Sequence, residues 1–266
     1  MKFVLGDYWQ AIHRPIGPAI TTFMDRFDEY HVVARFEHLP ADCPTEWNGV
    51  TPMLLRDLLV DSIAWVTCTE SGQLLIVSHY PTVIDGGESS AIVIRSTAWP
   101  ENVEGFVSVR IDETELTFFD THFPLSRDRY EPGETATITF CAFAVTIHRL
   151  ADIAEYAGTR KDLAEEISKV FERGQTFLRP SPAVPDIEDR YVFMGQIGHI
   201  KKGKIGELTV YRAQIKLLPG LEIPLVFGKT SIDTPDWEPR EESFVSAIIF
   251  LHGYRTALSL LSSTSS

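Results

Sequence analysis

The chain has 266 residues, of which 44% are hydrophobic and 11% aromatic, and this apolar content excludes general disorder. Its formal net charge of −13 disfavours non-specific contact with nucleic acid or an anionic membrane. No apolar run approaches the roughly 18 residues of a membrane-spanning helix, and Asp7 comes too early for a signal peptide. The three cysteines lack metal-ligand or redox spacing, so we expect a reduced, cytoplasmic protein.

The acidic charge is concentrated in the first part of the chain. Residues 1–185 hold 15 Lys+Arg against 27 Asp+Glu, a net of −12, whereas residues 186–266 hold 9 against 10, a net of −1. Length and a proline-rich segment predict two domains. The predicted parts are an acidic α+β domain (1–178), a linker (179–185), a small OB-like β-barrel (186–257) and a disordered tail (258–266).

Apolar periodicity predicts the elements in chain order. The spacing indicates a helix within 17–30, a strand at 31–37, and a short helix at 51–59 that Thr51 caps. A later helix would begin at Thr159 and end at Gly174. Strands are predicted at 63–70, 73–80, 91–98, 105–111, 115–123, 135–148, 191–200, 206–217, 221–227 and 244–254.

Glycines in the strand at 191–200 point to a small barrel. Gly195 and Gly198 can mark a bulge that lets one strand serve both sides of the barrel. The expected fold class is therefore α+β, mainly antiparallel β, with two barrel or half-barrel modules and few helices. The C-terminal module is expected to be OB-like.

A weak internal sequence repeat occurs at an offset of 107 residues. Tyr130-Glu131-Pro132-Gly133-Glu134 and Trp237-Glu238-Pro239-Arg240-Glu241 each run into a long apolar strand, and Phe143 corresponds to Phe250. Such an offset indicates that one structural unit is used twice. Tyr130 and Trp237 are then structural plugs, or alternatively binding residues.

A second pattern is the strand end Phe118-Phe119-Asp120-Thr121, followed by the strand start Tyr130…Gly133-Glu134. This pattern resembles uncharacterised bacterial proteins with OB-like β-barrel modules. The resemblance covers less than a quarter of the chain and implies no known activity.

The clearest candidate binding surface is basic. Residues 190–216 contain six Lys or Arg and one acid, a local net of +5. The proposed ligand-binding residues are Lys201, Lys202, Lys204, Arg212, Tyr191, Phe193 and Tyr211. The cations would neutralise phosphates, and the aromatic rings would stack on bases. Alternatively, the lysines keep a hairpin soluble and prevent edge pairing.

Asp120 and His122 are the other candidate pair. They are two residues apart near a strand end, so their side chains could share one face as an acid/base pair or as part of a metal site. Alternatively, they are a turn residue and a surface histidine. No phosphate-binding loop, nucleophile elbow or zinc pattern is present, and no cofactor, metal or catalytic residue is predicted.

The resulting functional hypothesis is a non-enzymatic protein-binding module of adaptor or immunity type. A basic protein would suit the acidic charge of residues 1–185. The alternative is single-stranded nucleic-acid binding through residues 186–257. A membrane partner is not expected.

Overall fold

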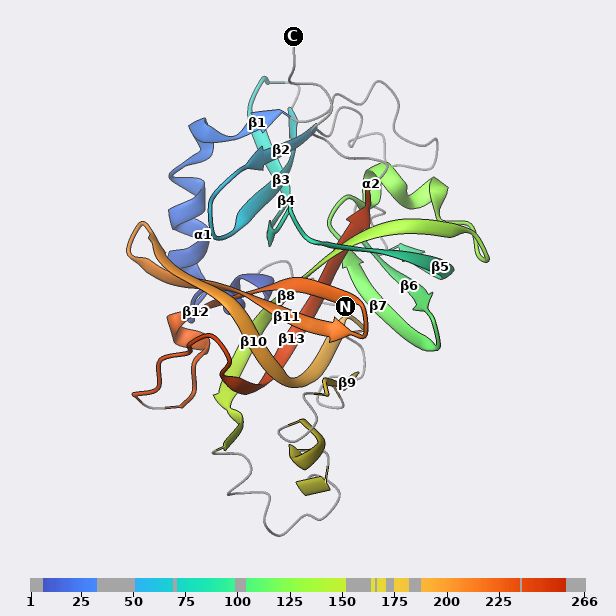
Figure 1. Cartoon of the computed structure of the whole chain (residues 1–266). Coiled ribbons are helices and arrows are strands. Elements are labelled where there is room, and N and C mark those ends of the chain that lie inside the picture. The colour runs from blue at the N-terminus through green and yellow to red at the C-terminus, as the bar shows by residue number, and fades with distance from the viewer. Residues whose placement is uncertain are drawn as a thin grey trace.

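Two β-sheets and a few short helices make up the described parts of the chain (Figure 1). The computed structural model describes residues 7–32, 51–68, 71–98, 104–151, 164–165, 167–170, 175–181, 188–234 and 236–256. The helical elements are η1 (Asp7–Ala11), α1 (Gly17–Met24), η2 (Phe27–Glu29), α2 (Phe123–Ser126), η4 (Arg127–Arg129) and η6 (Lys229–Ser231). The predicted class, mainly antiparallel β with few helices, is confirmed.

The smaller sheet has four strands and the larger one has nine. The small sheet contains, in order, β1 (His31–Val32), β2 (Thr51–Leu55), β3 (Asp61–Cys68) and β4 (Leu74–Thr82). The large sheet contains β5 (Gly87–Ala98), β6 (Gly105–Ile111), β7 (Thr114–Asp120), β8 (Thr135–Arg149), β9 (Phe177–Pro180), β10 (Arg190–Ile205), β11 (Leu208–Leu218), β12 (Leu221–Gly228) and β13 (Phe244–Arg255).

The large sheet closes into a ring that is not a clean barrel. β5, β6, β7, β13 and β8 pair in one closed circuit. β10, β11, β12, β8 and β13 pair in another. The two long strands β8 and β13 therefore belong to both circuits and pair with each other in antiparallel fashion.

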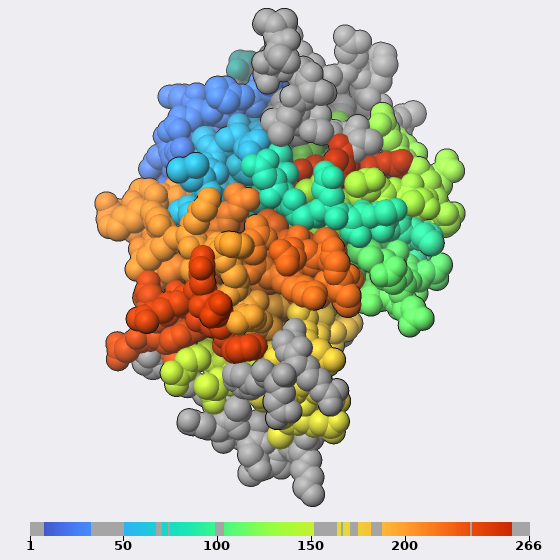
Figure 2. Space-filling view, viewed as in Figure 1, coloured from blue at the N-terminus to red at the C-terminus, as the bar shows by residue number. Residues whose placement is uncertain are grey.

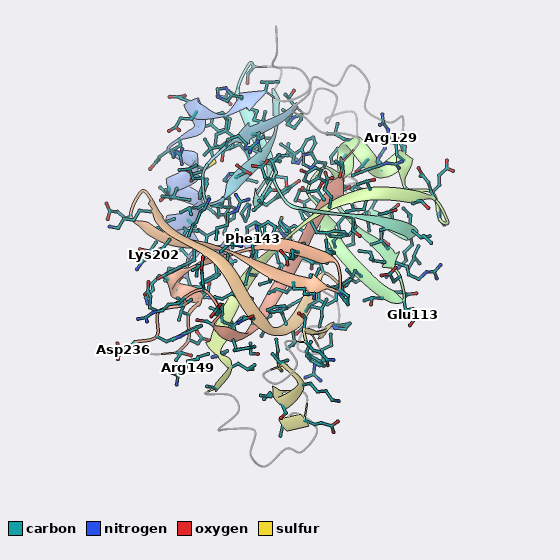
Figure 3. The ribbon with its side chains drawn as sticks, in the orientation of Figure 1. Glu113, Arg129, Phe143, Arg149, Lys202 and Asp236 are labelled. Carbon is teal, nitrogen blue, oxygen red and sulfur yellow. The ribbon has the colours of Figure 1, made fainter. Side chains whose placement is uncertain are left out.

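β8 is buried on both faces along its middle. Phe140, Ala142 and Ala144 point into the core between the strands of the ring. The alternate side chains, including Phe143, point into the second core beneath the small sheet, and Figure 3 labels Phe143 near the centre of the molecule. A strand buried on both faces needs apolar residues at every position, which accounts for the nearly continuous apolar sequence of β8.

β10 serves both sides of its circuit, as its glycines predict. Residues 190–196 pair with β13, and residues from Ile197 onward pair with β11. The register shifts between Gly198 and Lys201, so the expected bulge is confirmed. The C-terminal strands do not close on themselves, however, because β12 and β13 also pair with β8.

The division of the chain into domains stays a prediction, and the sheet itself runs across it. The predicted linker begins inside β9, whereas residues 182–185 lie outside the described residues. The predicted tail 258–266, Thr159 and Gly174 also lie outside them, although residues 164–165 and 167–170 are helical as expected.

One predicted helix is a strand. Residues 51–59 have leucines at helical spacing, but β2 occupies Thr51–Leu55 and pairs with both β1 and β3. Pairing on both sides satisfies the backbone of this segment, and Leu54 and Leu55 are buried in the second core. Tertiary contacts here outweigh local helix propensity.

The N-terminal turn η1 fastens the small sheet to the ring. Trp9 on this turn is buried, and its indole nitrogen donates a hydrogen bond of 3.0 Å to the His79 carbonyl of β4. On the ring side, a Cβ added to Gly228 would lie 1.7 Å from the Ile12 carbonyl oxygen. Only glycine lets the two backbones approach this closely.

Candidate functional site

The β10–β11 hairpin divides the predicted basic residues between different surroundings. Lys201 to Lys204 lie within β10 and not in a loop, because the tight turn comes at Gly206 and Glu207. Lys201 lies directly opposite Arg212, and Lys202 lies opposite Tyr211. Since side chains alternate along a strand, Lys201 and Arg212 share one face while Lys202 points to the other.

The three predicted aromatic residues are not available for stacking on a base. Tyr191, Phe193 and Tyr211 are buried in the core of the ring. The Tyr191 hydroxyl accepts a bond of 2.6 Å from the Thr117 amide. A ring surrounded by core residues cannot offer its face to a nucleotide, so this part of the predicted site is corrected.

Lys202 is engaged on its own side of the hairpin, where Figure 3 labels it. Its ammonium donates a bond of 2.6 Å to Glu238 and lies 5.6 Å from the centre of the Tyr211 ring. The Tyr211 hydroxyl donates to the same carboxylate at 2.9 Å. The bond from Lys202 lowers the pKa of Glu238. The charge of Lys202 is therefore already paired with a carboxylate of the same chain.

The other face of the hairpin borders an open cleft of about 720 Å³. In Figure 2, the blue to cyan surface around β2 and β3 adjoins the orange surface of β10 and β11. The lining residues are Arg56, Asp57, Leu58, Asp85, His199, Lys201, Arg212, Ala213 and Gln214. The structure thus brings Lys201 and Arg212 together in the cleft, whereas Lys202 and Lys204 do not line it.

A single buried carboxylate holds the two loops that form the wall of the cleft. Asp61 accepts bonds from the Arg56 guanidinium at 3.0 Å and from the Asp57 amide at 3.1 Å. Its second oxygen accepts a bond of 2.8 Å from the Ile84 amide. Burial raises the pKa of Asp61, and these bonds and the Arg56 charge act in the opposite direction.

The acids of the cleft already have cationic partners. Asp85 receives a bond of 2.9 Å from Arg56, and Asp57 receives one of 2.9 Å from Arg26. Arg212 donates a bond of 3.2 Å to the Asp85 carbonyl. Across the described ranges, the ammonium of Lys201 has no hydrogen-bond or ion-pair partner, and Arg212 has no ion-pair partner, so the two cations of the hairpin side are not held by carboxylates of the chain.

Leu58 adds an apolar group to this charged cleft. Its exposed fraction is 88%, compared with 54% for Leu75 and 52% for Val32, the next most exposed large apolar residues of the described chain. Local sequence patterns did not identify Leu58, Arg56 or Asp61 as parts of a site. They meet the hairpin only through folding, and no short motif could have indicated this.

Asp120 and His122 do not form a surface site. Both are buried, so the interpretation of His122 as a surface residue is wrong. Asp120 accepts bonds of 2.8 Å from the His122 amide and 2.9 Å from the Tyr130 hydroxyl, and a short one from Ser126. Burial raises the pKa of Asp120 to about 6 and lowers that of His122 to about 3.

The plug interpretation of Tyr130 is confirmed by its burial and by its bond to Asp120. Trp237 is partly buried against the same core. His252 of β13 is fully buried, with its ring centre 4.4 Å from that of Tyr8 and 4.8 Å from that of Phe143.

In the described part of the chain, no group of three or more His, Cys, Asp and Glu side chains is placed to hold a metal. Likewise, none of the described helices has the length and hydrophobicity to cross a membrane. The chain matches no known protein family and no curated protein.

Proposed function

We propose that the chain is a non-enzymatic protein-binding module, of adaptor or immunity type, and that the cleft is its binding surface. The observation that carries this proposal is Leu58, which is 88% exposed beside charged side chains held in ion pairs. An exposed apolar side chain surrounded by polar side chains that are already held in place suits a protein contact. Few side chains have to be immobilised on binding, so the entropy cost of association is small.

The net charge of the chain supports a partner protein that carries positive charge on the parts of its surface that do not contact the cleft. The net charge of −13 would attract such a protein from solution and increase its association rate. A cytoplasmic location is part of the same proposal. The three cysteines support this location, because their spacing is not typical of disulfides or metal ligands. Cys141 is buried and free.

The proposal also includes an internal duplication, with 87–149 and 190–255 as two copies of one unit. In each copy the first strand pairs with the second and the fourth. The third strand of each copy pairs in parallel with the fourth strand of the other. This correspondence supports a duplication at the offset seen in the sequence.

Affinity capture with matched variants tests protein binding. The immobilised full chain should retain a specific protein from a lysate of its source, and Leu58→Asp should lose it. Leu75→Asp changes an exposed leucine outside the cleft and should retain the same protein. If nothing is retained, or if all three chains retain the same proteins, the proposed function is wrong.

Single-stranded nucleic-acid binding through 186–257 is the second candidate. Lys201 and Lys204 support it, because both are exposed and neither has a partner within the described residues. Its predicted stacking residues are buried, which leaves electrostatic attraction alone. Salt-sensitive polarisation changes of a labelled oligonucleotide would favour this candidate over the first.

A further inference from the structure

We propose that the cleft binds a carboxylate-bearing segment of a partner protein, with Lys201 and Arg212 contacting the carboxylate and Leu58 contacting a neighbouring apolar side chain. This inference rests on the protein-binding function proposed above and specifies the chemistry of the partner. It names acidic side chains next to apolar ones as the recognised feature.

The donors for a carboxylate come from adjacent strands. Lys201 and Arg212 are directly opposite each other on β10 and β11, so their side chains leave the sheet side by side. The bond from Arg212 to the Asp85 carbonyl orients the guanidinium and engages one of its nitrogens. Within the described residues its other nitrogens have no partner, and the fork geometry of a guanidinium suits a carboxylate.

The acids in the cleft form their ion pairs with cations other than Lys201 and Arg212. Asp85 is held by Arg56, and Asp57 is held by Arg26, each at 2.9 Å. Arg56 is in turn shared with Asp61. Arg26 is likewise shared between Asp57 and Glu29, so these two guanidiniums only partly neutralise the acids around the cleft. The attraction for a carboxylate is therefore local to Lys201 and Arg212, which have no ion-pair partner within the described residues.

The same acids make the cleft a poor site for a polyanion. A nucleic acid places a phosphate at every nucleotide, so neighbouring phosphates would meet Asp57 or Asp85. The rings that would stack on its bases are in the core. A protein segment can instead present one carboxylate to the cations and an apolar side chain to Leu58.

The size of the cleft also suits a segment more than a domain surface. Its volume of about 720 Å³ lies within the range of small-ligand pockets, roughly 300–1,000 Å³. Such a volume accommodates a few side chains of an extended segment. Recognition of acidic motifs by clustered cations is a recurring mode of peptide binding.

Labelled peptides and the full chain provide the test. The probe is a fluorescein-labelled peptide with a single Glu next to Leu in an otherwise uncharged segment, compared with peptides that carry Gln or Lys in place of that Glu. At low ionic strength, about 50 mM salt, the Glu peptide should bind about tenfold more tightly than the Gln peptide by fluorescence polarisation. Any binding of the Lys peptide to the acidic surface should not depend on Lys201.

Matched variants locate the binding. Lys201→Glu should weaken binding of the Glu peptide about tenfold, while Lys204→Glu makes the same charge change on the same strand outside the cleft and should leave affinity unchanged. Leu58→Ser should weaken binding several-fold, and Leu75→Ser should not. None of these exposed side chains is part of a core, so the fold should be retained.

Three results would overturn the inference. These are equal binding of the Glu and Gln peptides, an equal loss of affinity in Lys201→Glu and Lys204→Glu, and Lys201-dependent binding of oligothymidine in place of the peptide. If the Glu peptide fails while Leu58-dependent capture of a protein persists, only the carboxylate assignment is wrong. If Leu58-dependent capture fails as well, the proposed function is also wrong.

Discussion

Phe143 of β8 lies directly opposite Phe250 of β13, although the two residues are 107 positions apart in the sequence. On either side of this pair, Ala144 pairs with Ile249 and Ala142 pairs with Leu251. The same offset of 107 residues relates Ala142 to Ile249 and Ala144 to Leu251, so it exchanges these two pairs. The ladder between these strands is thus nearly symmetric about the Phe143–Phe250 pair. It is also the structural link between the two circuits of the ring.

Because both circuits use this ladder, we expect residues 186–257 not to fold alone. Without β8, the fragment would leave β12 and β13 with unpaired backbone groups and exposed core side chains. Circular dichroism during urea titration should show no cooperative transition for the fragment and one for the full chain. A sharp transition in the fragment would show that it is an independent domain.

Gly228→Ala should separate η1 from the ring. The added Cβ would overlap the Ile12 carbonyl oxygen at 1.7 Å, and relieving this overlap requires a backbone shift. We expect a loss of about 2–4 kcal/mol in the free energy of unfolding, measured by chemical denaturation. Gly198→Ala is the control, because a Cβ there has no neighbour within 4 Å. Equal losses in the two variants would contradict the role of close approach.

Asp189 should make the protein less stable as the pH rises. The side chain is fully buried. Burial raises its pKa from 3.8 to about 7, an effect that Tyr8 and Arg190 reduce. Between these two pKa values, the unfolded chain has released the proton that the folded chain still holds. Stability therefore falls from about pH 4 to pH 7 and then levels off.

Asp189→Asn should remove that part of the pH dependence, which amounts to a few kcal/mol, on the order of 1.4 kcal/mol for each pKa unit. Urea denaturation of both proteins at several pH values measures it. Asp236→Asn is the control, since Asp236 is exposed and its left-handed backbone also accepts asparagine. A wild-type slope that persists in Asp189→Asn would disprove the assignment.

Tyr130→Phe should destabilise the buried Asp120 cluster by about 1–2 kcal/mol, because the bond of 2.9 Å to the carboxylate is lost. Burial raises the pKa of Asp120 to about 6, and the Tyr130 bond opposes that rise. The bond favours the ionised carboxylate, so the loss should be larger at pH 8 than at pH 5. Thermal denaturation at both pH values measures this difference.

The matched control for this prediction is Tyr211→Phe. Tyr211 also donates to a carboxylate at 2.9 Å, but Glu238 is 40% exposed and water can replace the bond. We expect a smaller loss, of about 0.5 kcal/mol, with little dependence on pH. If the two variants lose the same stability at both pH values, burial of Asp120 is not the cause.

The sequence predicted the strands of the ring well because their signals are local. The apolar run of β8 predicts a long strand, and the glycines of β10 predict a bulge, each from a few neighbouring residues. Residues 51–59 were assigned to a helix because their leucines have helical spacing, whereas pairing with β1 and β3 decides their conformation.

The cleft could not be predicted in the same way. Its parts come from the β2–β3 loop, the β4–β5 loop and the β10–β11 hairpin, and Asp61 connects the first two through bonds to Arg56 and Ile84. Burial of Tyr191 and Tyr211 also depends on how the ring closes. Strand alternation does separate Lys201 from Lys202, and that division was accessible from the sequence.

The position of β13 in the chain has a consequence for biosynthesis. Every strand that pairs with it, β7, β8 and β10, leaves the ribosome earlier, and neither circuit can close until residues 244–255 have emerged. Between the synthesis of β8 and that of β13, the edge of β8 that pairs with β13 therefore stays unpaired in the nascent chain. An unpaired strand edge in an incomplete chain favours association with other chains, so this interval is the one in which the chain is most open to misassembly.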